Sequence, residues 1–168
     1  LQGQYLWTIF ISRFMHAGAW HLIMNMISLI FLGGFIEKII GKKRFLLFYL
    51  IAGIFAGLFF VLISYVFNVD MNSYAVGASG AIFGIAALIA VLTPKLPVYM
   101  MFIPIATPMW LAVIIMLGVL WLISLTVGLP IGNTAHLGGA ITGLVYGFYL
   151  RARHGRKIKL LNKMLIQK

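Results

Sequence analysis

Five long apolar runs constrain this chain more than any other feature of its sequence. A helix needs about 20 apolar residues to cross the hydrocarbon core of a bilayer. Hydrophobic residues make up 63% of the chain and charged residues 9%, a balance outside the range of soluble domains. We therefore predict an all-α, polytopic integral membrane protein with five transmembrane helices. The runs extend over Trp20 to Ile36, Phe45 to Phe67, Ala75 to Leu92, Met109 to Val127 and Ala135 to Leu150.

The stretch from Leu96 to Pro108 is apolar but too short for a sixth crossing. Pro97, Pro104 and Pro108 interrupt it, and proline breaks helices. We interpret this stretch as interfacial or re-entrant. The chain has no cysteine, which excludes disulfides, thiolate catalysis and cysteine metal sites.

Basic residues gather on one side of the predicted bundle. Of the 13 Lys and Arg residues, all but Arg13 follow the first, third or fifth run. Lys and Arg accumulate in cytoplasmic loops, so we expect the C-terminus to lie in the cytoplasm. We expect the protein itself to lie in the cell membrane. The net charge of +11 then reflects topology and attraction of the tail to anionic membrane lipid, and not a nucleic-acid surface. We divide the chain into a transmembrane domain over 1–150 and a basic tail over 151–168, which either lies along the inner membrane surface or is frayed.

Polar side chains lie where the first, third and fifth runs begin, all on the side opposite to the basic residues. Intramembrane polar residues are costly and usually face a cavity or one another, which makes this cluster a candidate functional site. From the helical rise we expect Ser79 roughly 10 Å below the outer surface. The polar residues are His16, His21, Asn25, Ser79, Asn133, Thr134 and His136.

Small residues at four-residue spacing predict close packing of the third and fifth helices. They are Gly80 and Gly84 on one helix and Gly139, Gly143 and Gly147 on the other. Close packing would bring the His136 imidazole within hydrogen-bond reach of Ser79, and histidine is the usual base that activates a serine hydroxyl. Each residue alone also fits a structural role, in which its polar atoms bond to the backbone.

His21 and Asn25 lie four residues apart and share one helical face. Both donate hydrogen bonds, so they are candidates for stabilising an oxyanion together with the backbone N–H of Ser79. A polar cluster that ties the outer loop to the helix start is the alternative. For His16 we favour a structural role.

Glu37 and Asp70 are the only carboxylates, which excludes two classes of membrane protease. An aspartyl protease needs two facing aspartates, and a zinc protease of the HExxH kind needs a glutamate between its histidines. Asp70, nine residues before Ser79, is a possible third member of a triad, although we favour a Ser/His dyad. A metal site of three histidines, His16, His21 and His136, remains open.

Three segments resemble motifs of the rhomboid intramembrane serine proteases. HAGAWHLIMN (16–25) is similar to the HxxxxHxxxN of that family, GASG (77–80) to its GxSG, and AHLGGAITG (135–143) to its AHxxGxxxG. The resemblance covers roughly residues 7–150 and implies a rhomboid-like helical bundle. It implies Ser79 as nucleophile, His136 as general base and then acid, and His21 and Asn25 as oxyanion partners. The residues expected to support this site are His16, Gly77, Gly80, Phe83, Gly139 and Gly143.

The resemblance also implies hydrolysis of a peptide bond in or near the transmembrane segment of a membrane-protein substrate, through an acyl-enzyme and without a cofactor. The family core has six helices, so we expect its first helix to be missing here. Phe83 stands where a tyrosine is frequent and can stack on His136, and Trp7-Thr8 replaces a common Trp-Arg pair. We expect the loop 128–134 to cap the site and the fourth span to act as a gate.

Two other functions compete with proteolysis. A non-catalytic rhomboid-like binder of transmembrane clients would use the same cavity, but such relatives typically lack the serine or the histidine, and this chain has both. A small transporter is weakened by the lack of intramembrane carboxylates and of a repeated half. The oligomeric state is not predicted.

Overall fold

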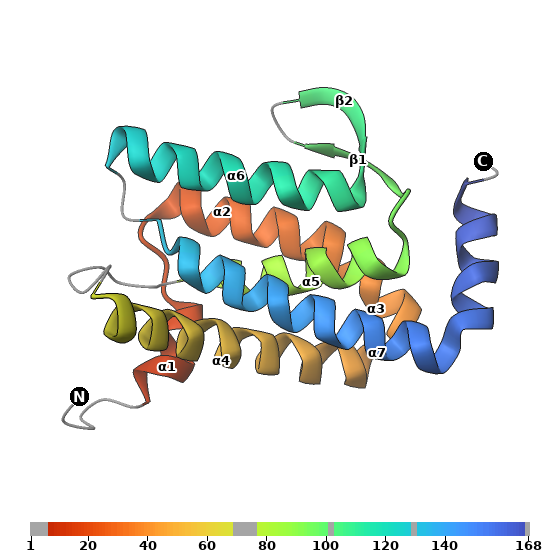
Figure 1. The fold of residues 1–168 in the computed structure, drawn as a ribbon, viewed down its shortest axis with the longest axis horizontal. Coiled ribbons are helices and arrows are strands. Elements are labelled where there is room, and N and C mark those ends of the chain that lie inside the picture. The colour runs from red at the N-terminus through yellow and green to blue at the C-terminus, as the bar shows by residue number, and fades with distance from the viewer. Residues whose placement is uncertain (1–6, 69–76, 101–102, 129–130, 167–168) are drawn as a thin grey trace.

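The computed structural model describes residues 7–68, 77–100, 103–128 and 131–166, and most of these lie in helices. The long helices run side by side and form a bundle (Figure 1). In chain order the elements are α1 (Thr8–Ile11), the 3-10 turn η1 (Ser12–Phe14), α2 (Ala19–Ser28), the π-helical segment η2 (Leu29–Gly33), α3 (Gly34–Ile40), α4 (Lys42–Phe67), α5 (Ser79–Leu92), β1 (Pro97–Met100), β2 (Ile103–Pro108), α6 (Met109–Val127) and α7 (Asn133–Ile166).

The five predicted crossings are present as helices, and the predicted helical bundle is confirmed. α2, η2 and α3 follow one another without a break and form one span, Ala19–Ile40. This span, α4 and α6 are long and apolar enough to cross a membrane by length and composition. α5 is shorter, with 14 residues, and α7 continues from its apolar part into the basic segment.

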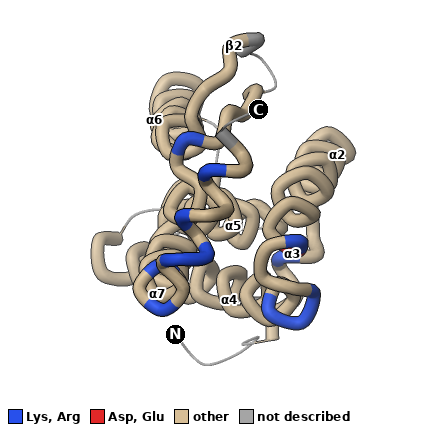
Figure 2. The backbone as a smooth tube through the Cα atoms, turned by 90° about the vertical axis from the view of Figure 1, so that its right-hand side faces the viewer, with Lys and Arg blue, Asp and Glu red and all other residues tan. Residues whose placement is uncertain are grey.

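α5 is the central helix of the bundle. In the view along the helices it lies between α4, α6 and α7 (Figure 2). Ile85, Leu88 and Ile89 on α5 are completely buried. The peripheral helix α6, by contrast, buries only residues of its first two turns among those described, and Leu125 near its end is 81% exposed. The helix that begins with Ser79 is therefore the best-packed element of the fold.

Backbone-to-backbone packing joins α5 to α7 through the predicted glycines. A Cβ added to Gly139 would collide with the carbonyl group of Gly80, and a Cβ added to Gly143 would collide with that of Gly84. One turn further on, Gly147 packs closely against the side chain of Val91. Side chains at these positions would push the helices apart, so the glycines determine how closely α5 and α7 approach.

The stretch from Leu96 to Pro108 forms an antiparallel β-hairpin, a conformation that no pattern in the sequence predicted. Pro97 pairs with Pro108 and Val98 with Thr107, and the register becomes irregular between Val98 and Met100. Proline is tolerated at edge strands, where its missing N–H is not needed for pairing. Both strands of a two-stranded hairpin are edges, which reconciles the prolines with a strand conformation.

The basic tail is an ordered helix in the structure. α7 continues past Leu150, kinks at His154, where φ is −127° and ψ is 28°, and then turns across the direction of the bundle (Figure 1). Ile158 is 9% exposed and belongs to the main hydrophobic core, and Asn162 donates a 2.7 Å hydrogen bond to the carbonyl of Leu92. Packing against the end of α5 therefore orders this segment, at least as far as Asn162.

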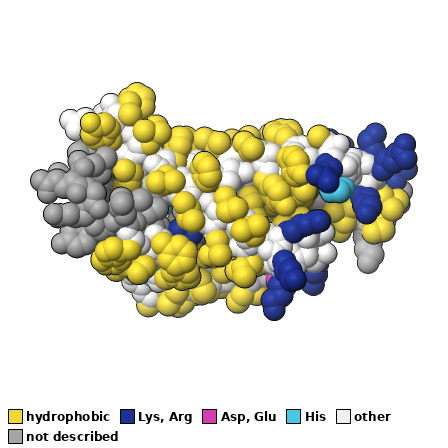
Figure 3. Space-filling view, turned by 90° about the horizontal axis from the view of Figure 1, so that it is seen from below, with side chains coloured by type: hydrophobic (Ala, Val, Ile, Leu, Met, Phe, Trp, Pro, Cys, Tyr) yellow, Lys and Arg dark blue, Asp and Glu magenta, His cyan; other side chains and the backbone are white. Residues whose placement is uncertain are grey.

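Charged and apolar side chains separate along the bundle. Apolar side chains cover most of the face in Figure 3, and Lys and Arg gather at the end that carries the last part of α7. Figure 2 shows the same end, with basic residues on α7 and around the turn between α3 and α4. We call it the basic end. Arg13 lies apart from it, 4% exposed and packed against α4.

Candidate active site

Ser79 and His136 meet at the end of the bundle opposite to the basic end. Ser79 is the first residue of α5, and His136 lies in the first turn of α7. The distance between Ser79 Oγ and His136 Nε2 is 2.8 Å, within hydrogen-bond range, across 57 residues of sequence. Gly139 on α7 allows this approach, because a Cβ there would collide with the carbonyl group of Gly80.

The imidazole of His136 is held by packing more than by hydrogen bonds. Its ring stacks on that of Phe83, with centroids 4.7 Å apart and an interplanar angle of 29°. His136 is 6% exposed, and its Nδ1 has no hydrogen-bond partner in the described part of the chain. Within the described residues, Ser79 Oγ is therefore the one hydrogen-bond partner of this imidazole, and the dyad stays a prediction. Asp70, the possible third member, lies outside the described residues.

His21 and Asn25 face the backbone of Gly77, two residues before Ser79. A Cβ added to Gly77 would lie 2.9 Å from His21 Nε2 and 3.1 Å from Asn25 Nδ2. Gly77 has a φ of +99°, which favours glycine over any residue with a side chain. Its N–H donates a 2.8 Å hydrogen bond to the carbonyl of Ser12, which ties this loop to the segment before α2.

Both side chains that face Gly77 offer a hydrogen-bond donor. His21 Nδ1 accepts a 3.4 Å hydrogen bond from the N–H of Ala17, so in the neutral ring Nε2 carries the proton. Asn25 is 6% exposed, and its Nδ2 has no partner among the described residues. Two N–H groups thus face Gly77, two residues before Ser79, and donors of this kind can stabilise an oxyanion.

His16 lies beside this site and contacts it through His21. The two imidazole rings meet edge-on, with centroids 5.3 Å apart, and the buried Nε2 of His16 has no partner in the described chain. The described residues include no group of three His, Cys, Asp or Glu side chains that could hold a metal ion. His16, His21 and His136 therefore do not form the three-histidine metal site that the sequence left open.

Comparison with known proteins identifies the family of this chain. A family model described as Rhomboid domain matches residues 3–153, which is most of the chain. The chain belongs to the rhomboid family. Its apolar helices and this membership make it an integral membrane protein.

Named rhomboid relatives come from plants, fungi and bacteria. RHOMBOID-like protein 1 of Arabidopsis thaliana is 36% identical over 151 residues, which cover 88% of this chain and 35% of that protein. The rhomboid protease GluP of Bacillus subtilis is 36% identical over 92% of this chain and 27% of its own length. The rhomboid protease GlpG of Haemophilus influenzae is 28% identical over 88% of this chain and 71% of its own length. The chain thus spans well under half of the first two of these relatives.

Arg13 is a structural residue of this rhomboid chain that sequence reasoning missed. Its guanidinium donates hydrogen bonds to the carbonyls of Phe10, at 2.9 Å, and of Leu50 on α4, at 2.8 Å. Gly53 leaves room for it, because a Cβ there would lie 2.9 Å from the guanidinium. Burial lowers the pKa of this guanidinium. A lone arginine at the non-basic end of an apolar bundle was the available signal, since an arginine there needs partners.

The cap and the gate of the rhomboid site stay predictions. Part of the loop 128–134 lies outside the described residues. α6 follows the hairpin and precedes this loop, and the side chains of its second half are mostly exposed. Light packing is what a movable helix requires, but it does not by itself identify a gate.

Proposed function

We propose that this rhomboid chain is an intramembrane serine protease that hydrolyses a peptide bond in or near the transmembrane segment of membrane-protein substrates. The 2.8 Å contact between Ser79 Oγ and His136 Nε2 is the observation that carries the proposal. Membership in a family with named proteases supports it. The two donors at Gly77 support it independently, since a serine bonded to a histidine for purely structural reasons would not need them.

In the proposed reaction, His136 Nε2 takes the hydroxyl proton of Ser79 while Oγ attacks the carbonyl carbon of the substrate. The carbonyl oxygen becomes an oxyanion, which accepts hydrogen bonds from His21 Nε2–H, Asn25 Nδ2–H and the backbone N–H of Ser79. The C–N bond then breaks, and His136 returns the proton to the leaving amine. A water molecule, deprotonated by His136, hydrolyses the resulting acyl-enzyme and restores Ser79.

The length of α5 supports cleavage below the membrane surface. Its 14 residues rise roughly 21 Å, whereas the hydrocarbon core is about 30 Å thick. If Leu92 lies at one surface, Ser79 lies inside the bilayer near the other. The positive-inside rule places the basic end in the cytoplasm, so the site would open toward the extracytoplasmic side of the cell membrane.

A substrate helix must expose a carbonyl to Ser79 before it can react. The carbonyls of an intact helix are hydrogen-bonded to its own backbone, so we expect the substrate to enter laterally and to unwind near the cleavage point. Small or helix-breaking residues there would lower the cost of unwinding. The lightly packed α6 is the helix that we propose moves aside.

Cleavage of a model transmembrane substrate in liposomes tests the proposal. We expect Ser79→Ala and His136→Ala each to lower the cleavage rate by at least about a thousandfold, because nucleophile and base act as a unit. Ser28→Ala and His154→Ala are matched controls outside the site and should retain the wild-type rate.

Two outcomes would contradict the proposal. One is cleavage by either site variant at the rate of its control. The other is a folded, substrate-binding wild-type protein, tested also as the full natural chain, that releases no fragment. The second outcome would favour a non-catalytic binder of transmembrane clients.

A further inference from the structure

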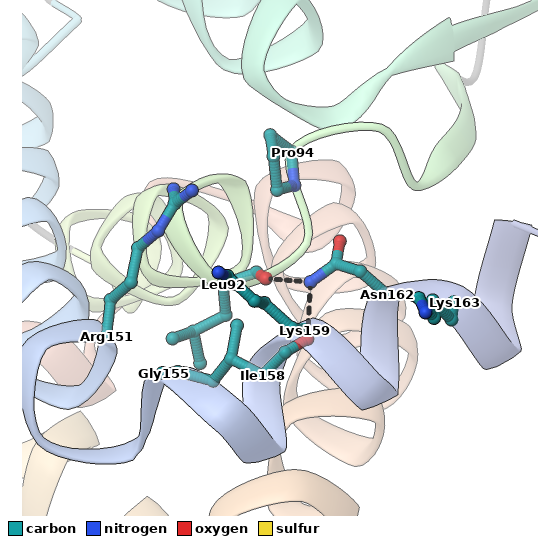
Figure 4. Close-up of a pocket in the computed structure, with 8 residues that line it drawn as sticks. All are labelled: Leu92, Pro94, Arg151, Gly155, Ile158, Lys159, Asn162 and Lys163. Atoms are coloured by element: carbon teal, nitrogen blue, oxygen red, sulfur yellow. Dashed lines mark hydrogen bonds between the residues drawn. The ribbon is translucent and has the colours of Figure 1, made fainter.

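A cleft at the basic end lies between the last turn of α5 and the kinked part of α7. Its volume is about 590 Å³. Figure 4 shows Arg151 on one side, Lys163 on the other, and Leu92, Ile158, Lys159 and Asn162 between them. It is at the opposite end of α5 from Ser79, so it takes no part in the proposed proteolysis.

Hydrogen bonds to the end of α5 hold the walls of this cleft together. Asn162 Nδ2 donates to the carbonyl of Leu92 at 2.7 Å and to that of Ile158 at 2.8 Å, and both bonds are drawn in Figure 4. The guanidinium of Arg151 donates to the carbonyl of Val91 at 3.4 Å. The carbonyls at a helix C-terminus repel anions. Asn162 and Arg151 donate to two of these carbonyls at the end of α5, which removes part of the repulsion.

Three cations line the cleft without an anionic partner. Arg151, Lys159 and Lys163 are exposed, and the described part of the chain contains no salt bridge to any of them. The whole sequence offers 2 acidic residues against 13 Lys and Arg. Lys159 and Lys163 are four residues apart on one helix, where like charges repel. A bound anion would relieve this repulsion.

Apolar side chains form the other part of the cleft. Leu92 is 1% exposed and Ile158 9%, and Pro94 lies beside them. These two side chains are largely covered already, but most of the lining that stays exposed is apolar, Pro94 included. A small hydrophilic anion would leave this lining uncovered, whereas the glycerol and upper acyl chain of a lipid can cover it. The cleft also lies at the end of the membrane-spanning helices, beside the last turn of α5, which is the level at which lipid headgroups lie.

We propose that this cleft binds the phosphate headgroup of an anionic phospholipid. The phosphate lies among Arg151, Lys159 and Lys163, and the glycerol backbone lies against the exposed apolar lining around Pro94. A headgroup that carries its own cation, such as phosphocholine, meets three unpaired cations and binds less well. Because the ligand contacts both α5 and α7, its binding stabilises their packing at this end.

Thermal stability in non-ionic detergent, titrated with lipid, measures the affinity, because a ligand that binds the folded state raises the melting temperature. The probes are phosphatidylglycerol, phosphatidylcholine with the same acyl chains, and glycerol 3-phosphate. We expect phosphatidylglycerol to bind most tightly. Lys159→Gln with Lys163→Gln should weaken it by roughly 30-fold, from the usual contribution of a lysine near an anionic surface.

Lys42→Gln with Lys43→Gln is the matched control. It removes the same charge from the same end of the bundle but outside the cleft, and it should leave the affinity within about threefold of the wild type. Equal weakening in both double variants would overturn the proposal in favour of diffuse attraction. Equal binding of phosphatidylcholine would also overturn it. Glycerol 3-phosphate binding as tightly as the lipid would assign the cleft to a free phosphate compound instead.

Gly155 provides a second test that does not remove any cation. A Cβ added there meets no atom within 4 Å, so the position accepts a side chain. Gly155→Glu places a carboxylate in the cleft and should abolish the preference for phosphatidylglycerol, whereas Gly155→Ala should keep it. Retained preference in a folded Gly155→Glu protein would contradict the proposed site.

Discussion

Gly80→Ala tests whether packing of α5 determines the geometry of the candidate site. The new Cβ would lie 2.6 Å from the Cβ of Ala56 on α4. Carbon atoms in contact are about 3.5–4.0 Å apart, so α5 must shift by about 1 Å. Ser79 is the adjacent residue and shifts with it relative to His136. A displacement of this size can cost on the order of a hundredfold in rate, and we expect such a loss in the cleavage assay.

Overpacking should also destabilise the protein by about 1–3 kcal/mol, measured as a lower melting temperature in detergent. Ala56→Gly removes the methyl group with which the new Cβ collides, and the next neighbour of that Cβ, the carbonyl oxygen of Ala135, is 3.4 Å away. We therefore expect the double variant, Gly80→Ala with Ala56→Gly, to recover much of the lost activity.

Gly118→Ala is the matched control, because a Cβ on Gly118 of α6 meets nothing within 4 Å. It should leave activity unchanged and slightly stabilise the helix. Full activity of Gly80→Ala would refute the reasoning. So would a double variant no more active than the single one, since the collision with Ala56 would then not be the cause.

Substitutions at three further positions test the parts around the proposed dyad. Gly77→Ala introduces a side chain at a φ of +99° and against His21 and Asn25, the two proposed oxyanion donors, so cleavage should fall on the order of a hundredfold; a normal rate would separate this loop from catalysis. Phe83→Tyr should keep the stack on His136 and nearly all activity, whereas Phe83→Ala should lose up to about tenfold; equal rates would show that the stack does not matter. Arg13→Met removes the hydrogen bond to the Leu50 carbonyl and should lower stability by about 2 kcal/mol in detergent unfolding, and an unchanged melting temperature would contradict that role.

Local patterns in the sequence were sufficient to predict which segments form helices, but not the residues at which these helices begin and end. The third apolar run was predicted from Ala75, whereas α5 begins at Ser79, with residues 69–76 outside the description. Hydropathy does not detect where a helix begins, because apolar residues continue into the preceding loop. The hairpin over 97–108 was missed for a related reason. Prolines excluded a helix there, but strand pairing depends on which segments meet.

The tail after Leu150 shows a second limit of local patterns. Its alternation of basic and apolar residues was compatible with a surface helix or a frayed end. In the structure the segment after Leu150 is an ordered helix because it contacts α5. Asn162 donates a hydrogen bond to the carbonyl of Leu92, 70 residues away in the sequence. Those contacts also create the cleft proposed here as a lipid site. The basic residues of the tail indicated attraction to membrane lipid, but no pattern in the sequence indicated a cleft.

The sequence by itself predicted the apolar helices of the bundle, the side on which the charges gather and the residues that are candidates for chemistry. These properties depend on the transfer of local segments between water and lipid, which composition and order already specify. Only the tertiary structure decided that Ser79 and His136 lie 2.8 Å apart, that His21 and Asn25 face Gly77, and that Arg13 is anchored to α4. Each of these contacts joins distant segments. The distances between the atoms in these contacts depend on how closely the helix backbones pack. The glycines of α5 permit close packing only when the partner helices lie against them.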